Sequence, residues 1–455
     1  MESAVEGYRG PALDLLRRYG TKAGQYVEVL MSDGQTLRGL VIPRYQSADD
    51  RHIVLKLKSG YNVGLDVRTI TSIKSLSGGT ENASNDLSSS KNESEKTSLS
   101  GKSLLLISTG GTIASRVDYR SGAVFPALSA ADLYSSVPEL DKIARIEPEV
   151  VFSITSENMT PRDWSTLSSK IIDLASAKNP DGVVVMMGTD TLGYASAALS
   201  FSLLGFKFPV VIVGAQRSSD RPSSDAALNL RSAAFFAVES KKPGVFVAMH
   251  RNESDNEIAI HQGTRVRKNH TSRRDAFQSI DSHLIATVRD ANQIQWRADQ
   301  ITPNIPVEYL LKTKFDSSVA LVKFHPGFDP GVLDYLADQK QIKGIIVEGT
   351  GLGHVSDGVV SKIAQINKAG VFVGITSQCI WGHVDLFVYG PGRDLISAGG
   401  VPLENMFAET AFAKLSWVVG NFPGRTKELM LREFIGEFNA RIPLSSKMSR
   451  SGSAQ

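Results

Sequence analysis

The stretch LLLISTGGTIA at residues 104–114 decides the fold of this chain. Its consecutive apolar residues predict a buried strand, and the glycine–threonine turn at 109–112 marks the point where that strand ends. The stretch VVVMMGTDT at residues 183–191 shows the same pattern and runs into a small-residue segment typical of a buried helix. Strands that are apolar throughout are typical of parallel sheets covered by helices on both faces. We therefore predict two buried parallel strands that each end in a glycine–threonine turn.

The residues in these turns suit a particular chemistry. In open α/β sheets ligands bind at the carboxyl ends of strands, so both turns are expected to face one pocket. They supply the hydroxyls of Thr112 and Thr189, the carboxylate of Asp190 and the bare backbone of two glycines, an inventory that suits acyl transfer from an amide by a threonine nucleophile. Tyr119 stands in a glycine-containing stretch after Thr112 and is a candidate lid residue. Each turn alone also matches a strand-to-helix connection with a threonine or aspartate cap, but two in one domain favour a functional site.

Length and composition limit the class of protein. The chain has 455 residues, too many for one ordinary domain, and its 50 basic and 47 acidic residues give a net charge of +3. A nearly neutral chain lacks the strong positive field typical of nucleic-acid- or membrane-binding proteins. The single cysteine, Cys379, excludes an internal disulfide and is expected to be a small buried residue. The sequence starts without a signal peptide and contains no long apolar run, so we expect a cytoplasmic protein without membrane contact.

Periodicity and composition divide the chain into five segments. Residues 1–75 combine a short helical pattern with alternating strands and tight turns, which predicts a small β-barrel. Residues 76–101 are rich in serine and predict a flexible linker. Strands alternate with helices from 102 to 305 and again from 316 to 440, which predicts two α/β domains, and 441–455 read as a disordered tail. The barrel has two open interpretations: it docks RNA or another subunit, or it only packs against the body.

Three further patterns carry no function in this interpretation. The segment SGKS at 100–103 precedes a strand, whereas a phosphate-binding loop follows one. The segment GTGLG at 349–353 does not fit the dinucleotide fingerprint and is expected to be structural. His325 and His354 are too isolated in the sequence to indicate a metal site, so no metal is expected.

Four ordered segments resemble the bacterial-type L-asparaginase and glutaminase family. They are TGGTIA at 109–114, TSENM at 155–159, GTDT at 188–191 and RKNHT at 267–271, the last followed by DAF at 275–277. The resemblance extends from about residue 103 to 440 and implies an asparaginase-like body of two α/β domains with parallel sheets, preceded by the small N-terminal β-barrel. It also implies a set of site residues: Thr112, Thr189, Asp190 and Lys268 for catalysis, and Tyr119, Ser156 and Glu157 for substrate binding.

The roles within this set also follow from the resemblance. Thr112 would be the nucleophile, while Lys268 and Asp190 would activate a threonine or a water molecule. Ser156 and Asp190 would hold the α-carboxylate and α-ammonium of the substrate. Glu157 stands where simple asparaginases usually have glutamine. For Lys268 the residues alone favour a solvated cation in the basic run 265–274, so its role depends on the resemblance.

The predicted N-terminal barrel indicates one particular group within this family. Residues 42–62 and Glu157 are similar to the D-subunit family of archaeal glutamyl-tRNA(Gln) amidotransferases. That family implies a subunit that hydrolyses glutamine and passes ammonia to a partner, the amidotransferase E subunit, which binds the tRNA and uses ATP and magnesium to convert Glu-tRNA(Gln) to Gln-tRNA(Gln). No cofactor is then expected in this chain, and a homodimer within a heterotetramer is expected. The alternatives are a free-standing L-asparaginase or glutaminase, and a non-enzymatic RNA- or protein-binding scaffold.

Overall fold

The computed structural model describes most of the chain outside the serine-rich segment and the termini. The described residues are 7–42, 44, 49–57, 62–76, 101–111, 115–117, 124–126, 138–217, 224–297, 305–339 and 341–439. The predicted linker lies almost entirely outside them, and the predicted tail lies wholly outside them.

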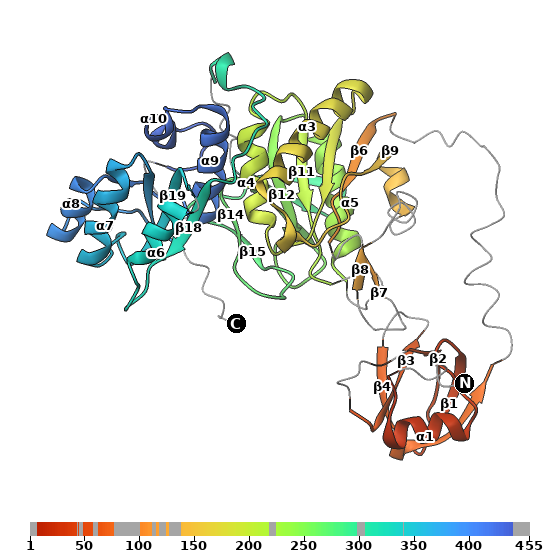
Figure 1. The fold of residues 1–455 in the computed structure, drawn as a ribbon. Helices are drawn as coiled ribbons and strands as arrows, with labels where there is room; N and C mark the ends of the chain where they lie inside the picture. Colours follow the sequence, from red (N-terminus) through yellow and green to blue (C-terminus); the bar gives the residue numbers. More distant parts are fainter. Residues whose placement is uncertain are drawn as a thin grey trace, which may run out of the picture.

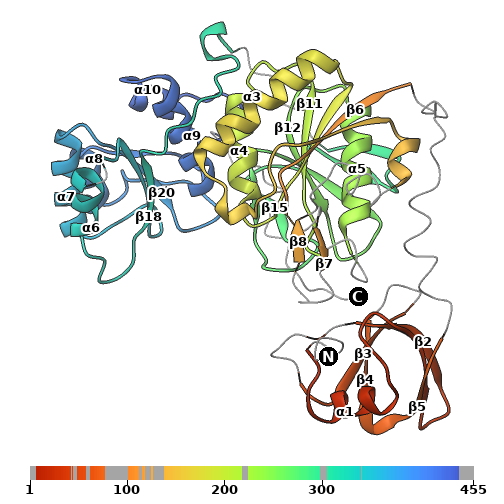
Figure 2. The same cartoon turned by 45° about the vertical axis from the view of Figure 1, so that its right-hand side comes forward.

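The described part of the N-terminal β unit consists of one helix and a curved antiparallel sheet, and Figures 1 and 2 show it as a body of its own. Helix α1 spans Gly10–Arg18, and the sheet has the strand order β4-β3-β2-β1-β5. The strands are β1 (Tyr26–Met31), β2 (Thr36–Val41), β3 (His52–Leu57), β4 (Asn62–Asp66) and β5 (Ile70–Ser75). Alternate residues of the strands, such as Val27 and Val29, pack against Leu16 of α1. The sequence analysis missed β5, whose alternation of isoleucine with serine, threonine and lysine is weak.

The first α/β unit contains an eight-stranded sheet in the order β17-β16-β13-β12-β11-β10-β6-β9. Its strands are β6 (Ser103–Ser108), β9 (Arg145–Val150), β10 (Gly182–Met186), β11 (Pro209–Val213), β12 (Gly244–His250), β13 (Glu257–Gln262), β16 (Ala286–Arg289) and β17 (Gln293–Trp296). The five neighbouring strands β9, β6, β10, β11 and β12 are parallel, as predicted for this domain. Strands β13, β16 and β17 run antiparallel and were not predicted. The tight turn that joins β16 to β17 uses left-handed backbone at Asp290 and Ala291.

Helices cover both faces of this sheet (Figure 1). They are α3 (Pro161–Lys178), α4 (Leu192–Ser202) and α5 (Ala226–Glu239). Val183 and Val185 of β10 pack in the core formed with α3 and α4, whereas Val184 and Met186 pack in the core formed with α5. Every residue of β10 is buried, and the strand is therefore apolar without alternation.

The second α/β unit has a four-stranded parallel sheet in the order β18-β19-β20-β21. Its strands are β18 (Val319–Lys323), β19 (Gly344–Gly349), β20 (Phe372–Ser377) and β21 (Gly400–Pro402). Its helices are α6 (Gly331–Asp334), which continues as a π turn over Tyr335–Gln339, α7 (Asp357–Lys368), α8 (Gly390–Ser397), α9 (Ala408–Asn421) and α10 (Thr426–Leu431). Helix α9 begins only at Ala408, after residues 400–402, which pair with β20 as strand β21.

Short elements complete the chain. Among the described residues, two ribbons lie outside the large sheets: β7 (Ser115–Val117) with β8 (Val124–Pro126), and β14 (Val266–Lys268) with β15 (Phe277–Ser279). Single 3-10 turns occupy Val67–Thr69, Pro138–Lys142, Ser156–Asn158 and Val307–Tyr309. No helix among the described residues has the length and apolar character needed to cross a membrane.

Helix α9 joins the two α/β units into one continuous core. It packs on α4, where the rings of Phe201 and Trp417 stack with their centroids 5.6 Å apart. Behind them Lys414 and Glu437 form an ion pair of 2.7 Å in which both side chains are fully buried. Loss of one partner of such a buried pair strongly destabilises a protein, because the other charge is then left without compensation. The pair therefore ties the segment after α10 to α9.

His261 on β13 gives the fold a defined response to acid. The side chain is buried, its Nε2 has no hydrogen-bond partner among the described residues, and burial lowers its pKa from 6.5 to about 3. The folded protein therefore holds this histidine neutral, while the unfolded chain takes up a proton as the pH falls below about 6.5. Its contribution to stability is complete above about pH 6.5 and is lost towards pH 3, at about 1.4 kcal/mol per pH unit.

We predict that His261→Gln flattens the acid side of the stability profile. The variant cannot titrate in this range, so its melting temperature should fall less than that of the parent between about pH 7 and pH 5. Thermal unfolding of both proteins in matched buffers measures the difference. Equal losses in the two proteins would show that other groups, such as carboxylates, control this range.

Candidate active site

The two glycine–threonine turns lie side by side at the carboxyl edge of the first sheet. Strands β6 and β10 are parallel neighbours, with Ser108 opposite Met186. The backbone N–H of Thr109 and its hydroxyl both donate to the carbonyl of Met186, at 2.9 and 3.1 Å. The two turns therefore begin at the same level of the sheet, and the prediction that they face one site is consistent with their register.

Glycine is required where the turns touch. Gly111 has a φ of +85°, and a Cβ there would lie 2.2 Å from the backbone nitrogen of Gly188. A Cβ on Gly188 would lie 2.8 Å from the Oγ of Ser156. These distances are shorter than any van der Waals contact, so the backbones approach as closely as they do only because neither residue has a side chain. The close approach also brings the buried Ser156 against the second turn.

Lys268 completes the group from a different element. It is the last residue of β14, and its ammonium donates to the Oγ1 of Thr189 at 2.8 Å and to the Oδ1 of Asp190 at 2.7 Å. Thr189 is buried and the Lys268 side chain is 14% exposed, whereas the Asp190 carboxylate is 69% exposed. The lysine side chain is therefore largely covered, whereas most of the aspartate carboxylate is open. The solvated position considered for Lys268 does not occur.

The arrangement can move protons. A lysine held between a hydroxyl and a carboxylate has the geometry of a general acid–base group. Helix α4 begins directly after the turn, and the hydroxyl of its capping residue Thr191 donates to the carbonyl of Ser156 at 2.7 Å. The amino end of a helix favours negative charge beside it, as on a substrate carboxylate or a developing oxyanion.

The structure brings together four of the predicted site residues: Ser156, Thr189, Asp190 and Lys268. Glu157 is exposed on the same 3-10 turn as Ser156. Thr112 and Tyr119 lie outside the described residues, although Gly111, directly before Thr112, is described. Their predicted roles therefore stay predictions.

A third strand-end turn was missed by the sequence analysis. Gly214 follows β11, and a Cβ on it would lie 2.6 Å from the Cγ2 of Thr189. The carboxylate of the fully buried Asp225 accepts from the backbone N–H groups of Gln216 and Arg217 and from Asn229. The signal was available, because VVIVG at 210–214 also has an apolar strand that ends in glycine.

The buried His250 extends the hydrogen bonds around this third turn. The Nδ1 of His250 lies 2.6 Å from the Oδ1 of Asn229, and its Nε2 lies 3.3 Å from Asp255, which also pairs with Arg274. Burial lowers the pKa of His250, and the neighbouring Asp255 opposes that shift. Because Arg274 follows Lys268 on the next loop, hydrogen bonds connect that loop with the third turn.

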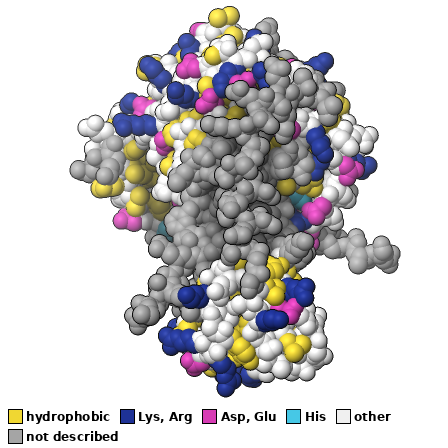
Figure 3. All heavy atoms as spheres, turned by 90° about the vertical axis from the view of Figure 1, so that its right-hand side faces the viewer, with side chains coloured by type: hydrophobic (Ala, Val, Ile, Leu, Met, Phe, Trp, Pro, Cys, Tyr) yellow, Lys and Arg dark blue, Asp and Glu magenta, His cyan; other side chains and the backbone are white. Residues whose placement is uncertain are grey.

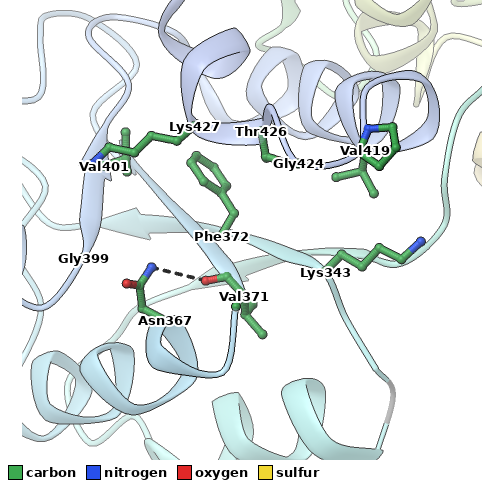
Figure 4. A pocket seen from close by; sticks show the side chains of 12 residues that line it. Lys343, Asn367, Val371, Phe372, Gly399, Val401, Val419, Gly424, Thr426 and Lys427 are labelled. Atoms are coloured by element: carbon green, nitrogen blue, oxygen red, sulfur yellow. Dashed lines mark hydrogen bonds between the residues drawn. The ribbon is translucent and has the colours of Figure 1, made fainter.

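Other polar features lie apart from this site. A cavity of about 470 Å³ lies in the second unit, at the amino ends of its strands. Lys343, Asn367 and Lys427 are among the residues that line it (Figure 4). Lys343 there is already paired with Asp316. Cys379 is exposed in the turn after β20, which corrects the expectation of a buried residue: the turn leaves the sheet there. The described part of the chain contains no cluster of three His, Cys, Asp or Glu side chains that could hold a metal ion.

Comparison with known protein families assigns the body and the β unit. Residues 103–302 match the family model "Asparaginase, N-terminal", and residues 318–430 match "Glutaminase/Asparaginase C-terminal domain". Residues 21–76 match the "GatD N-terminal domain". Among solved structures, the thermostable L-asparaginase from Thermococcus kodakarensis aligns with a TM-score of 0.65 and 33% identity over 74% of this chain and all of that one. A probable cytoplasmic L-asparaginase from Campylobacter jejuni aligns with a TM-score of 0.62 and 26% identity, over 73% and 100% of the two chains. The fold and the site thus define an asparaginase-type α/β protein with an added N-terminal unit.

Curated relatives cover the added unit as well. They are named as D subunits of glutamyl-tRNA(Gln) amidotransferase. The relative from Sulfurisphaera tokodaii is 43% identical over 96% of both chains, and the one from Saccharolobus solfataricus is 40% identical over 96% of this chain and 98% of that one. The chain belongs to the family of glutamyl-tRNA(Gln) amidotransferase D subunits. The resemblance drawn from its sequence motifs is thereby confirmed.

We predict that Gly111→Ala disrupts the site turn, whereas Gly370→Ala is tolerated. Both glycines have a similar left-handed backbone, φ of +85° and +91°, but a Cβ on Gly370 meets nothing within 4 Å. Both variants carry a strain of about 1 kcal/mol, and the clash with Gly188 should add several kcal/mol more in Gly111→Ala. Thermal unfolding compares the two. A melting temperature for Gly111→Ala equal to that of Gly370→Ala would contradict the close backbone contact.

Proposed function

We propose that this chain is the glutamine-hydrolysing subunit of a tRNA-dependent amidotransferase and supplies ammonia for the conversion of Glu-tRNA(Gln) to Gln-tRNA(Gln). The observation that carries the proposal is the ammonium of Lys268 within 2.8 Å of Thr189 and 2.7 Å of Asp190, beside the turn that leads to Thr112. Membership of the D-subunit family supplies the biological setting.

The proposed reaction has two halves. The hydroxyl of Thr112 attacks the amide carbon of glutamine, its proton passes to the leaving nitrogen, and ammonia departs from a glutamyl ester. Water then hydrolyses the ester, giving glutamate and the free hydroxyl. Lys268, held by Asp190 and Thr189, takes up and returns the proton in these steps. Backbone N–H groups at the close-packed turns are suited to the developing oxyanion.

Substrate binding follows from the charges of the site. The exposed carboxylate of Asp190 is suited to the substrate α-ammonium, and the buried Ser156, at the amino end of α4, is suited to the α-carboxylate. Glu157 adds a second carboxylate near the ammonium end. Tyr119 is the proposed lid residue over Thr112, and a lid that stays open until the partner docks would keep glutamine hydrolysis low until then.

The remaining steps belong to a partner in this proposal. The amidotransferase E subunit binds the tRNA and activates the glutamyl group with ATP and magnesium, so that this chain needs no cofactor. A homodimer of this chain within a cytoplasmic heterotetramer is the proposed assembly. The nearly neutral net charge of +3 is consistent with tRNA binding by the partner subunit. On the face drawn in Figure 3, basic side chains are spread over the surface among acidic ones.

We predict that the protein releases ammonia from glutamine and that Thr189→Ala, Lys268→Ala and Lys268→Arg each lower the rate by roughly 10³-fold. Arginine keeps the positive charge but does not give up its proton, so it cannot replace lysine in proton transfer. Ammonia release from glutamine and from asparagine, with and without the partner and charged tRNA, measures the effect. Near-parental rates in Lys268→Arg would reduce the lysine to an electrostatic role, and an inactive parent under all conditions would overturn the proposal.

A free-standing L-asparaginase is the second candidate, because the solved structures similar to the body are L-asparaginases. The same assay separates the two functions. A free asparaginase turns over asparagine at full rate without the partner, whereas an amidotransferase subunit responds to partner and charged tRNA.

We predict that removal of residues 1–100 leaves a folded α/β body with an intact site but impaired tRNA-dependent turnover. The β unit has a core of its own, and Lys268, Thr189 and Asp190 all lie in the body. Comparing the full-length and shortened chains, each with the partner and glutamyl-tRNA, tests the role of the β unit. Equal turnover would show that it plays no part in coupling and would favour the free enzyme.

A further inference from the structure

The segment that carries Lys268 is held between the two α/β units. Strand β14 has only three residues, and it lies where the units meet, close to α9 (Figure 1). Successive side chains of a strand point to opposite faces, so Arg267 and Lys268 face different neighbours. Lys268 reaches the catalytic turn of the first unit, while the Nε of Arg267 lies 2.8 Å from the Oε1 of Glu409 on α9 of the second unit.

Hydrogen bonds between side chains and backbone carbonyls across the two units already fix the path of this segment. The hydroxyl of Thr410 donates to the carbonyl of Thr264 at 2.9 Å, directly beside Glu409. The buried guanidinium of Arg265 donates to the carbonyls of Asn405 at 2.9 Å and Glu437 at 3.1 Å. These contacts set the course of the chain up to residue 265. The ion pair between Arg267 and Glu409 acts closest to Lys268, because it holds the residue directly before it.

We propose that Glu409 is a positioning residue for the site lysine: through its ion pair with Arg267 it holds β14 so that Lys268 stays on Thr189 and Asp190. The inference rests on the proposed glutaminase function. It also assigns the second α/β unit a part in the reaction, because Glu409 is the second residue of α9.

The surroundings make the charge of Glu409 consequential. Its side chain is 13% exposed, and its Oε2 is buried and has no hydrogen-bond partner among the described residues. Glu348, at the carboxyl end of β19, has its pKa raised by burial and by Glu409, while Lys323 and Arg267 oppose the shift. Tyr194 on α4 has its pKa raised to about 12 by burial and by the charges of Glu409 and Glu348.

Opposite charges therefore balance around β14. The cations Arg267, Lys268 and Lys323 face the carboxylates Asp190, Glu348 and Glu409, and Tyr194 stays neutral. Strand β15, which pairs with β14, has no titratable residue. The loop after Lys268 contributes an exposed His270 and three ion pairs, Arg273 with Asp275 and with Glu253, and Arg274 with Asp255. Removal of one partner of the Arg267–Glu409 pair changes this balance next to the site lysine.

The test is a cycle of three variants: Glu409→Gln, Arg267→Gln and the double variant. Each breaks the same contact, so each should lower the kcat of glutaminase roughly tenfold, the double variant no more than the singles, and KM should change less than about twofold. The pH of half-maximal kcat separates positioning from general loosening. It should fall in Glu409→Gln, which leaves a cation uncompensated, rise in Arg267→Gln, which leaves an anion, and return in the double variant.

Controls make every outcome decisive. Asp334→Asn breaks an ion pair with Lys362 elsewhere in the second unit and should leave kcat and its pH profile unchanged. The pH dependence of Lys268 acetylation by acetic anhydride, followed by mass spectrometry, probes the site lysine without requiring enzyme activity. Its midpoint should fall in Glu409→Gln and rise in Arg267→Gln, as the midpoint of kcat does. An inactive parent whose acetylation shifts as expected overturns the glutaminase function alone. An active parent with unchanged profiles in both single variants, or with shifts of the same sign, overturns the role of Glu409.

Discussion

The site depends on a contact in which backbone meets backbone with nothing between. The turns after β6 and β10 come so close that Gly111 has no room for a Cβ against the backbone of Gly188. Gly188 and Gly214 lack this room as well, against the side chains of Ser156 and Thr189. Interiors are packed to the density of crystals, so a single added carbon at such a point displaces whole turns. As a result, hydroxyls, a carboxylate and backbone donors converge at one edge of the sheet without any long side chain to hold in place.

The lysine comes to this edge by a different route. Strand β14 is too short to be stable alone and gains its position from both units: Val266 lies in the shared core, and Arg265 and Arg267 are bound by the second unit. Ribbons of this kind are typically held by tertiary contacts rather than by their own strand pairing. The two-unit architecture thus has a chemical purpose, because the rigid turn and the lysine are fixed by separate parts of one continuous core.

Sequence patterns were sufficient for the parts of the fold set by local burial. The unbroken apolar runs at 104–107 and 183–187 predicted parallel strands, and the residues after them predicted a site. The antiparallel strands β13, β16 and β17 escaped notice, and β16 and β17, with four residues each, are too short to show a clear periodicity. The position of Lys268 was visible only through family resemblance, because its partners lie 78 and 79 residues away. Pairings over such distances, like that of Arg267 with Glu409, are a property of the packed fold and leave no local pattern.

The buried ion pair between Lys414 and Glu437 has a consequence for synthesis of the chain. During translation the first α/β unit leaves the ribosome long before Glu437, and domains generally begin to fold as they emerge. Until residue 437 is available, the ammonium of Lys414 has no carboxylate to enter the core with, and Arg265 lacks one of its carbonyl acceptors. The final assembly of α9 against α4, and with it the fixing of β14, must therefore wait for nearly the last described residues. A chain that stalls earlier carries every site residue but lacks the carboxylate that completes the core behind them.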